Sequence, residues 1–166
     1  MDIKSKTEYP ANKLSNFAPN PFIMNGVKCA SMEGFLQSLK FKNPDMQKEV
    51  CKLVGFAAKK KGSKKNWKRD GILYWKGEEI NRFSQEYQKL LDKAFDSLSK
   101  NVKFKRALLA TGYAQLTHSI GKRSMKDTIL TKVEFTSRLM RTRDEIRSKM
   151  VSETFGWNET LQKLYP

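Results

Sequence analysis

Cysteine and histidine are scarce in this chain of 166 residues, which holds two cysteines and one histidine. Two cysteines are too few for a disulfide framework. With a single histidine and no CxxC pattern, the usual ligand sets of a zinc site are missing as well. We therefore expect no metal and no other cofactor. Cys29 and Cys51 are expected to be buried thiols in a reducing cytoplasm.

Long apolar segments are also missing. No apolar run is long enough to cross a bilayer, and the N-terminal stretch MDIKSKTEYP lacks the apolar core of a signal peptide. These absences predict a cytoplasmic protein.

Acidic residues are few, since 17 Asp and Glu stand against 33 Lys and Arg and leave a formal net charge of +16. A field of this sign attracts polyanions, which include nucleic acid, nucleotides and anionic membranes. Because the sequence has no membrane-directed segment, we expect a nucleotide-like molecule or nucleic acid as the partner, and no membrane.

General enzyme motifs are absent too. The sequence has no P-loop, no glycine-rich dinucleotide fingerprint, no GxSxG and no HExxH. A cysteine nucleophile would have to pair Cys29 or Cys51 with His118, and no spacing supports such a pair. The function must therefore be sought in less general patterns.

The segment Ser31–Lys42 (SMEGFLQSLKFK) has the clearest pattern. Its apolar residues recur at i, i+3, i+4 and i+7, the spacing of one buried helical face: Met32, Phe35, Leu36 and Leu39. Ser31 is a suitable N-cap. The pattern predicts an amphipathic helix over this segment.

Three polar residues of this helix, Glu33, Gln37 and Lys40, share one edge of the apolar stripe. A carboxylate, an amide and an amine would then lie at the border between core and solvent, where a pocket wall could form. The alternative is a solvated border, because Glu in a first turn and Lys in a last turn are each favoured by the helix dipole by about 0.3–1 kcal/mol.

Capping residues and apolar periodicity place the other elements. Helices are expected at 43–62, 84–98, 101–110, from Lys132 onward and at 158–164, and a short strand or turn at 72–75. Asn25-Gly26 between two short apolar segments predicts a β-hairpin with a type I′ turn. The chain is therefore expected to be mainly α, one compact helical domain with a few short strands that include this N-terminal hairpin.

A basic run, Lys59–Arg69 (KKKGSKKNWKR), has seven basic residues in eleven. It is either a solvated loop or an electrostatic cradle for phosphates. In the second case Trp67, Tyr74 and Trp75 could stack a base beside it, although Trp75 could equally be a core residue.

Four stretches, taken in order, have a familiar arrangement. These are Leu14–Phe41 (LSNFAPNPFIMNGVKCASMEGFLQSLKF), Gly55–Gly62 (GFAAKKKG), Lys103–Gly112 (KFKRALLATG) and Leu139–Ile146 (LMRTRDEI). They resemble the S/N-F, S-x-E and K-F opening, the A-K-x-x-G helix end, the K-F-x-x-x-L-L-x-T-G helix and the closing L-M-x-x-R helix of the NADAR, or YbiA-like, family. No single motif is very specific, and the order of all four carries the resemblance.

The resemblance implies a mainly α domain linked to ADP-ribose and related N-glycosides. Similar members are N-glycosidases that remove ADP-ribose from guanine in nucleic acid or cleave phosphoribosyl intermediates of riboflavin synthesis. Glu33 lies at the glutamate of S-x-E and Lys40 at the lysine of K-F, so both are the expected catalytic residues. A carboxylate can stabilise an oxocarbenium-like transition state and orient water. A lysine with a lowered pKa could attack the aldehyde of a ring-opened ribose and form a Schiff base with loss of water.

The expected substrate-binding residues serve three parts of such a ligand. Gln37 would bind sugar hydroxyls, and Asn16 and Phe17 would shape the pocket floor. The remaining candidates lie near phosphates or a base: Lys59, Lys61, Arg69, Trp75, Arg82 and His118. The ligand would be an ADP-ribose-like or phosphoribosyl small molecule, or ADP-ribose carried on nucleic acid.

The sequence departs from the family where many members carry Asp-x-x-Trp-Gly and Asn-x-Leu-Gly. It resembles a short branch that is common in phage and other mobile genomes, and Asp127 is at best a weak substitute for the missing aspartate. Two alternatives stay open: a non-catalytic module that sequesters ADP-ribose or a cyclic nucleotide signal, and a nucleic-acid-binding protein with a vestigial pocket. The expected organisation is an N-terminal extension at 1–13, the domain at 14–147, and a C-terminal extension at 148–166 packed on the domain.

Overall fold

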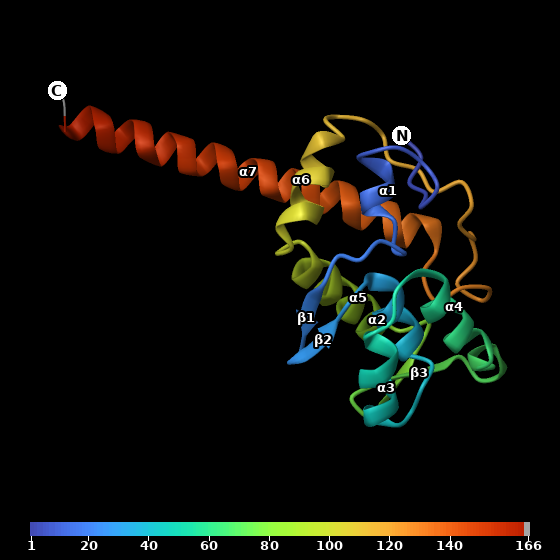
Figure 1. Cartoon of the computed structure of the whole chain (residues 1–166). Coiled ribbons are helices and arrows are strands. Elements are labelled where there is room, and N and C mark those ends of the chain that lie inside the picture. The colour runs from blue at the N-terminus through green and yellow to red at the C-terminus, as the bar shows by residue number, and fades with distance from the viewer. Residues whose placement is uncertain (165–166) are drawn as a thin grey trace.

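The computed structural model describes residues 1–164, apart from the side chains of residues 157 and 158. Helices predominate, as the sequence predicts, and two short hairpins lie among them (Figure 1). The helices are α1 (Ala11–Leu14), α2 (Met32–Ser38), α3 (Pro44–Cys51), α4 (Gly55–Ser63), the 3₁₀ turn η1 (Trp67–Arg69), α5 (Gln85–Leu98), α6 (Val102–Ala110) and α7 (Lys132–Leu164). The strands are β1 (Phe22–Met24), β2 (Val27–Cys29), β3 (Ile72–Trp75) and β4 (Glu78–Asn81).

Helix α2 is central and contacts α3, α4 and β2. Its N-cap is confirmed, because the Ser31 hydroxyl accepts a hydrogen bond from the Gly34 amide at 3.0 Å. The predicted apolar face is buried. The helix ends at Ser38 rather than at Lys42. Gly34 allows the C-terminal end of α3 and the residues after it to approach closely, since a Cβ atom at this position would lie 3.1 Å from the carbonyl oxygen of Val50 and 2.5 Å from that of Leu53.

The single helix predicted for 43–62 is wrong, because the chain breaks between Cys51 and Gly55 into α3 and α4. The predicted start is confirmed: Asn43 caps α3 through the Asp45 amide at 2.9 Å. Helix α3 ends at Cys51, and α4 begins at Gly55, whose left-handed φ of +55° is one that glycine adopts easily. The break lets α3 and α4 both pack on α2, an outcome that the apolar periodicity alone did not indicate.

Both hairpins turn through residues with positive φ. Asn25 (φ 48°) and Gly26 (φ 78°) join β1 to β2 in the predicted type I′ geometry. Lys76 (φ 52°) and Gly77 (φ 86°) join β3 to β4 in the same way. Strand β4 was not predicted, because its polar sequence lacks strand alternation and its turn lacks the Asn-Gly signal.

The last long helix begins at Lys132, as predicted, and a capping box stabilises its first turn. The Glu134 carboxylate accepts from the Thr131 amide at 2.8 Å, and the Thr131 hydroxyl accepts from the Glu134 amide at 3.1 Å. Helix α7 then packs against α5 and α6. Phe95 and Phe135 meet in the core with ring centroids 6.1 Å apart.

The predicted organisation of both termini is wrong. Residues 1–13 are part of the fold, since Ile3 is fully buried and Asp2 bridges to Thr117. Residues 158–164 form no separate helix, because α7 continues unbroken to Leu164. Its end, red in Figure 1, projects away from the body, and every described side chain from 148 onward is exposed. This segment is therefore not packed on the domain.

Membrane-spanning character is not seen within residues 1–164, where each helix is too short or too polar to cross a bilayer.

Candidate active site

A cavity of about 430 Å³ lies where five segments meet, and this volume is typical of small-molecule sites. Helix α2 forms one wall, and α4 with η1 forms a second. The loop at 118–130 and the N-terminal residues 5, 16 and 17 close the remaining sides. Glu33, Gln37 and Lys40 all face this cavity, so the edge of α2 singled out from the sequence is a pocket wall.

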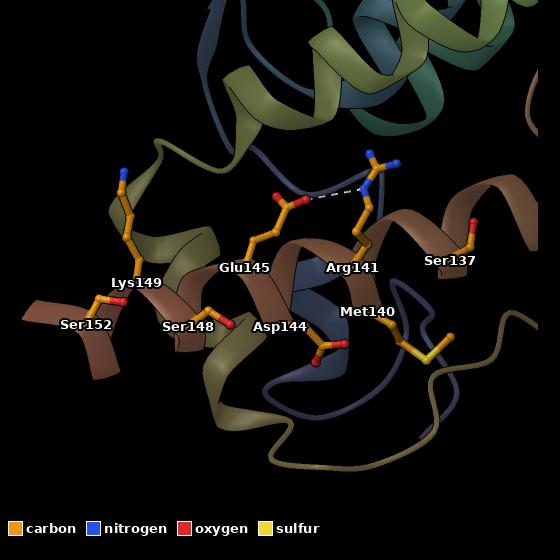
Figure 2. A pocket seen from close by; sticks show the side chains of 8 residues that line it. All are labelled: Ser137, Met140, Arg141, Asp144, Glu145, Ser148, Lys149 and Ser152. Atoms are coloured by element: carbon orange, nitrogen blue, oxygen red, sulfur yellow. Dashed lines mark ion pairs between the residues drawn. The ribbon is translucent and has the colours of Figure 1, made fainter.

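A larger hollow of about 760 Å³ runs along α7. Figure 2 shows that its lining side chains all come from this one helix, with Arg141 and Glu145 paired across a turn at 3.7 Å. A site needs groups that converge from several elements, and here they lie along one exposed surface. The smaller, multi-walled cavity is therefore the candidate site.

Glu33 is only 9% exposed and is held at both ends. Its amide donates to the Asn16 carbonyl at 3.0 Å, and its carboxylate accepts a hydrogen bond from Gln37 Nε2 at 2.8 Å. Burial raises the pKa of Glu33, while the Gln37 hydrogen bond and the charges of Lys40 and Lys59 partly oppose this rise. The carboxyl is therefore poised to keep a proton at higher pH than an exposed glutamate.

Lys40 has the opposite shift. Burial lowers the pKa of its amine, the positive charges of Lys68, Lys59 and Lys122 lower it further, and the charge of Glu33 raises it. A carboxyl with a raised pKa and an amine with a lowered pKa thus share a cavity. Such a divergence of two pKa values is characteristic of acid–base sites, although structural ion pairs can also produce it.

Two buried amide oxygens beside Glu33, Asn16 Oδ1 and Gln37 Oε1, have no hydrogen-bond partner among the described residues. Buried polar atoms are nearly always paired in folded proteins. Both residues line the cavity, so a ligand hydroxyl or N–H group could supply the missing donors.

His118 lines the same cavity from the loop at 118–130. Its Nδ1 donates to the carbonyl oxygen of Ile3 at 2.7 Å, because a carbonyl can only accept. Its ring stands edge-on to Phe135, with centroids 5.1 Å apart.

The family model for bacteriophage protein GP30.3 matches residues 8–144 of this chain. The chain belongs to this family. A relative from Enterobacteria phage T4, described as an uncharacterized 17.1 kDa protein in the Gp30-rIII intergenic region, is 38% identical over 149 residues, which cover 88% of this chain and 98% of the relative.

The fold is similar to the NMR structure of the Escherichia coli protein YbiA, with a TM-score of 0.61 over 91% of this chain and 86% of that one. The predicted YbiA-like resemblance is thereby confirmed. At 17% sequence identity, the similarity establishes the fold and does not extend to the reaction.

Seven of the predicted site residues meet in the cavity of this GP30.3 family member: Asn16, Phe17, Glu33, Gln37, Lys40, Lys59 and His118. Lys61 and Arg69 do not line it. On α4 the cavity side carries Lys59 and Ser63, one helical turn apart, and Lys61 is rotated away from both.

Two predicted ligand contacts are wrong. Arg82 is fully buried and pairs with Glu134 at 2.6 Å, so its guanidinium is used inside the fold and cannot reach a phosphate. Trp75 is a core residue that packs on Phe35 with centroids 5.1 Å apart and donates to Asn25 Oδ1. Trp67 is likewise buried, so the base-stacking platform proposed for the basic run is not formed by these two rings.

Several lining residues were missed by the sequence reasoning: Ser5, Ser63, Lys68, Lys122 and Thr128. Lys68 had been assigned only to the basic run, and Lys122 only to a polar loop. Asp127, named as a weak substitute for the missing family aspartate, also lines the cavity. No periodic signal could have indicated these residues, because most of them lie outside regular helices. Across residues 1–164, no group of three or more His, Cys, Asp and Glu side chains is arranged to hold a metal ion.

Proposed function

We propose that this protein is an N-glycosidase that hydrolyses the N-glycosidic bond of an ADP-ribose-type or phosphoribosyl substrate. The observation that carries the proposal is that Glu33, whose pKa is raised, and Lys40, whose pKa is lowered, line the same cavity. The family resemblance places the same two residues at the S-x-E glutamate and the K-F lysine.

Glu33 would act first as a proton donor. As the bond between the anomeric carbon and the base nitrogen breaks, its proton moves to the leaving nitrogen. The carboxylate left behind stabilises the positive charge of the oxocarbenium-like sugar. Water then adds to the anomeric carbon and releases a proton, so that a proton is available to restore the acid form of Glu33.

Unpaired acceptors and positive charges would bind the rest of the substrate. Gln37 Oε1 and Asn16 Oδ1 accept from the ribose hydroxyls, which supply the missing donors. The ammonium groups of Lys59, Lys68 and Lys122 surround the cavity and attract phosphate oxygens. A phosphorylated ribose therefore suits both the unpaired amide oxygens and the lysine ammonium groups. The net charge of +16 favours nucleic acid as a partner, so ADP-ribose carried on nucleic acid is one form of the proposed substrate.

Mass spectrometry of reaction mixtures tests the activity. The protein is incubated separately with NAD, ADP-ribose and DNA that carries ADP-ribose on guanine. We expect the released base, or DNA restored to unmodified guanine, from at least one of these substrates. Unchanged masses for all of them and for phosphoribosyl N-glycosides would contradict the proposal.

Sequestration without cleavage is the second candidate function. The cluster of Lys40, Lys59, Lys68 and Lys122 could bind phosphates without any chemistry, and the sequence lacks the Asp-x-x-Trp-Gly motif of many members. Tight binding of ADP-ribose or a cyclic nucleotide in calorimetry, with no turnover of any substrate, would favour this alternative.

A further inference from the structure

His118, the single histidine of the chain, is held in one tautomer. Its Nδ1 lies 2.7 Å from the carbonyl oxygen of Ile3 and must donate to it. In the neutral ring Nδ1 therefore carries the hydrogen, and Nε2 is left with a free lone pair. No described residue makes a hydrogen bond to Nε2, whereas Nδ1 is fully used.

The edge of the ring that carries Nε2 lies beside Gly121. A Cβ atom at Gly121 would lie only 2.5 Å from Cδ2 of His118, the carbon bonded to Nε2. Gly121 and His118 both line the cavity. The ring is also fixed from the side by its edge-on contact with Phe135, so its acceptor nitrogen has a defined position at the loop wall.

The N-terminal segment holds this wall in place. Ile3, whose carbonyl sets the tautomer, is fully buried. The Asp2 carboxylate accepts from the Ser119 amide at 2.8 Å and from the Ser119 hydroxyl. The Ser119 hydrogen bonds hold the pKa of Asp2 well below its usual range, so this anchor stays ionised at neutral pH. Ser119, which follows His118, is thus hydrogen-bonded to Asp2, which precedes Ile3.

We propose that Nε2 of His118 is the acceptor in this cavity that faces Glu33 across the ligand, with its tautomer set by the carbonyl of Ile3. The inference rests on the proposed function for its chemical consequence. During hydrolysis the water oxygen forms a bond to the anomeric carbon and its proton passes to Nε2, while the proton of Glu33 leaves with the base. Solvent then removes the proton from His118 and returns one to Glu33. Water is consumed, and the products are the free base and the ADP-ribose or phosphoribose with a hydroxyl on its anomeric carbon.

Nitrogen NMR of the histidine-labelled protein tests the acceptor role without any turnover, and a single histidine gives unambiguous signals. We expect the neutral ring as the Nδ1–H tautomer, and an Nε2 resonance that moves when ADP-ribose is added while Nδ1 moves little. Observation of the Nε2–H tautomer, or of an Nε2 resonance that does not move at saturating ADP-ribose, would overturn the inference.

His118→Asn tests the catalytic consequence, because the amide NH₂ can still donate to the Ile3 carbonyl while the Nε2 acceptor is lost. We expect a melting midpoint lowered by the loss of the edge-on ring contact with Phe135, a protein still folded at the assay temperature, KM within about threefold, and kcat lowered by about 100-fold or more. A kcat within about threefold of wild type would overturn the proton-acceptor step. If the wild type hydrolyses nothing, the proposed function fails, and the NMR result alone then decides whether Nε2 contacts the ligand.

Discussion

At the scale of single residues, the burial of Glu33 that suits the proposed proton donor also lowers the stability of the fold at neutral pH. Burial raises the pKa of this carboxyl above its ordinary value of 4.5. A carboxyl that binds its proton more tightly in the folded state costs stability once it ionises. Its contribution is favourable at low pH and is lost as the pH rises through the ordinary and then the raised value. Residues that weaken a fold in this way are common at functional sites.

Glu33→Gln should separate the two effects. The amide cannot ionise or donate a catalytic proton, so we expect ADP-ribose binding to persist and turnover to fall by about 100-fold or more. The melting midpoint should rise relative to wild type, more in mildly alkaline than in mildly acidic buffer. Calorimetric melting at the two pH values and a turnover assay check this, and undiminished hydrolysis would remove Glu33 from the mechanism.

Lys40 can act as a nucleophile or as an electrostatic ligand. Burial and neighbouring lysines lower the pKa of its amine, which increases the neutral fraction able to add to the aldehyde of a ring-opened ribose. Borohydride added during turnover should then fix the sugar's mass on a peptide that contains Lys40, and Lys40→Arg should abolish the adduct. If no adduct forms and Lys40→Arg keeps its activity, Lys40 is an electrostatic ligand only.

At the scale of elements, the site depends on how closely α4 approaches α2. A Cβ atom at Gly62 would lie 1.8 Å from Gln37 Oε1. The glycine therefore leaves room for the amide that holds Glu33. This contact joins α2 to α4. In the sequence, α3 and the unpredicted break after it lie between these two helices.

Gly62→Ala should displace the Gln37 amide. We expect a loss of about 1–3 kcal/mol in unfolding free energy from overpacking, together with weaker ADP-ribose binding. Gly156→Ala is the matched control, since nothing lies within 4 Å of a Cβ atom there. Denaturant titration and calorimetry measure both quantities. Equal affinities in the two variants would show that the Gln37 position does not matter for the ligand.

Helix α7 has a buried half and a projecting half. Leu139 is fully buried, whereas the described side chains from residue 148 onward are exposed. Deleting residues 149–166 should change the unfolding free energy by less than about 0.5 kcal/mol, while Leu139→Ala should cost about 2–5 kcal/mol. Urea unfolding of both variants decides this, and a large loss on truncation would mean that the projecting half supports the fold.

At the scale of the whole molecule, the net charge of +16 predicts salt-dependent binding to nucleic acid. Lys60, Lys61 and Lys64 are exposed, and the cavity is not lined by them. Replacing all three with Glu should therefore weaken DNA binding and flatten its salt dependence, by about 0.9 in slope for each phosphate that the protein no longer neutralises.

Reversing Lys89, Lys93 and Lys100 gives a control with the same change in charge on α5 and its C-terminal end, where these residues are also exposed. Fluorescence anisotropy at several salt concentrations measures the slopes. Equal slopes in the two triple variants would show that the basic run acts only through the total charge.

Local physical chemistry was sufficient to predict much of the fold. Ser31, Asn43 and the Thr131–Glu134 box mark helix starts because a side-chain oxygen there pairs with amides a few residues away. Asn25-Gly26 turns the first hairpin because both residues accept positive φ. The apolar face of α2 follows from its spacing, and the edge beside it lines the cavity, which is one of the two alternatives that the spacing left open. The family resemblance, rather than any spacing, singled out Glu33 and Lys40 within that edge.

Contacts distant in sequence decided the rest, because periodicity tells which face of an element is buried but not what covers it. Only the tertiary structure brings Lys122 and His118 into the cavity that α2 lines, and only it shows that the Ile3 carbonyl sets the histidine tautomer. From the sequence, Arg82 was a candidate phosphate ligand. In the structure its guanidinium pairs with Glu134, which lies 52 residues away. The amino-acid sequence thus determined the elements and one wall of the site, while packing determined the opposite wall and which charges remain available to a ligand.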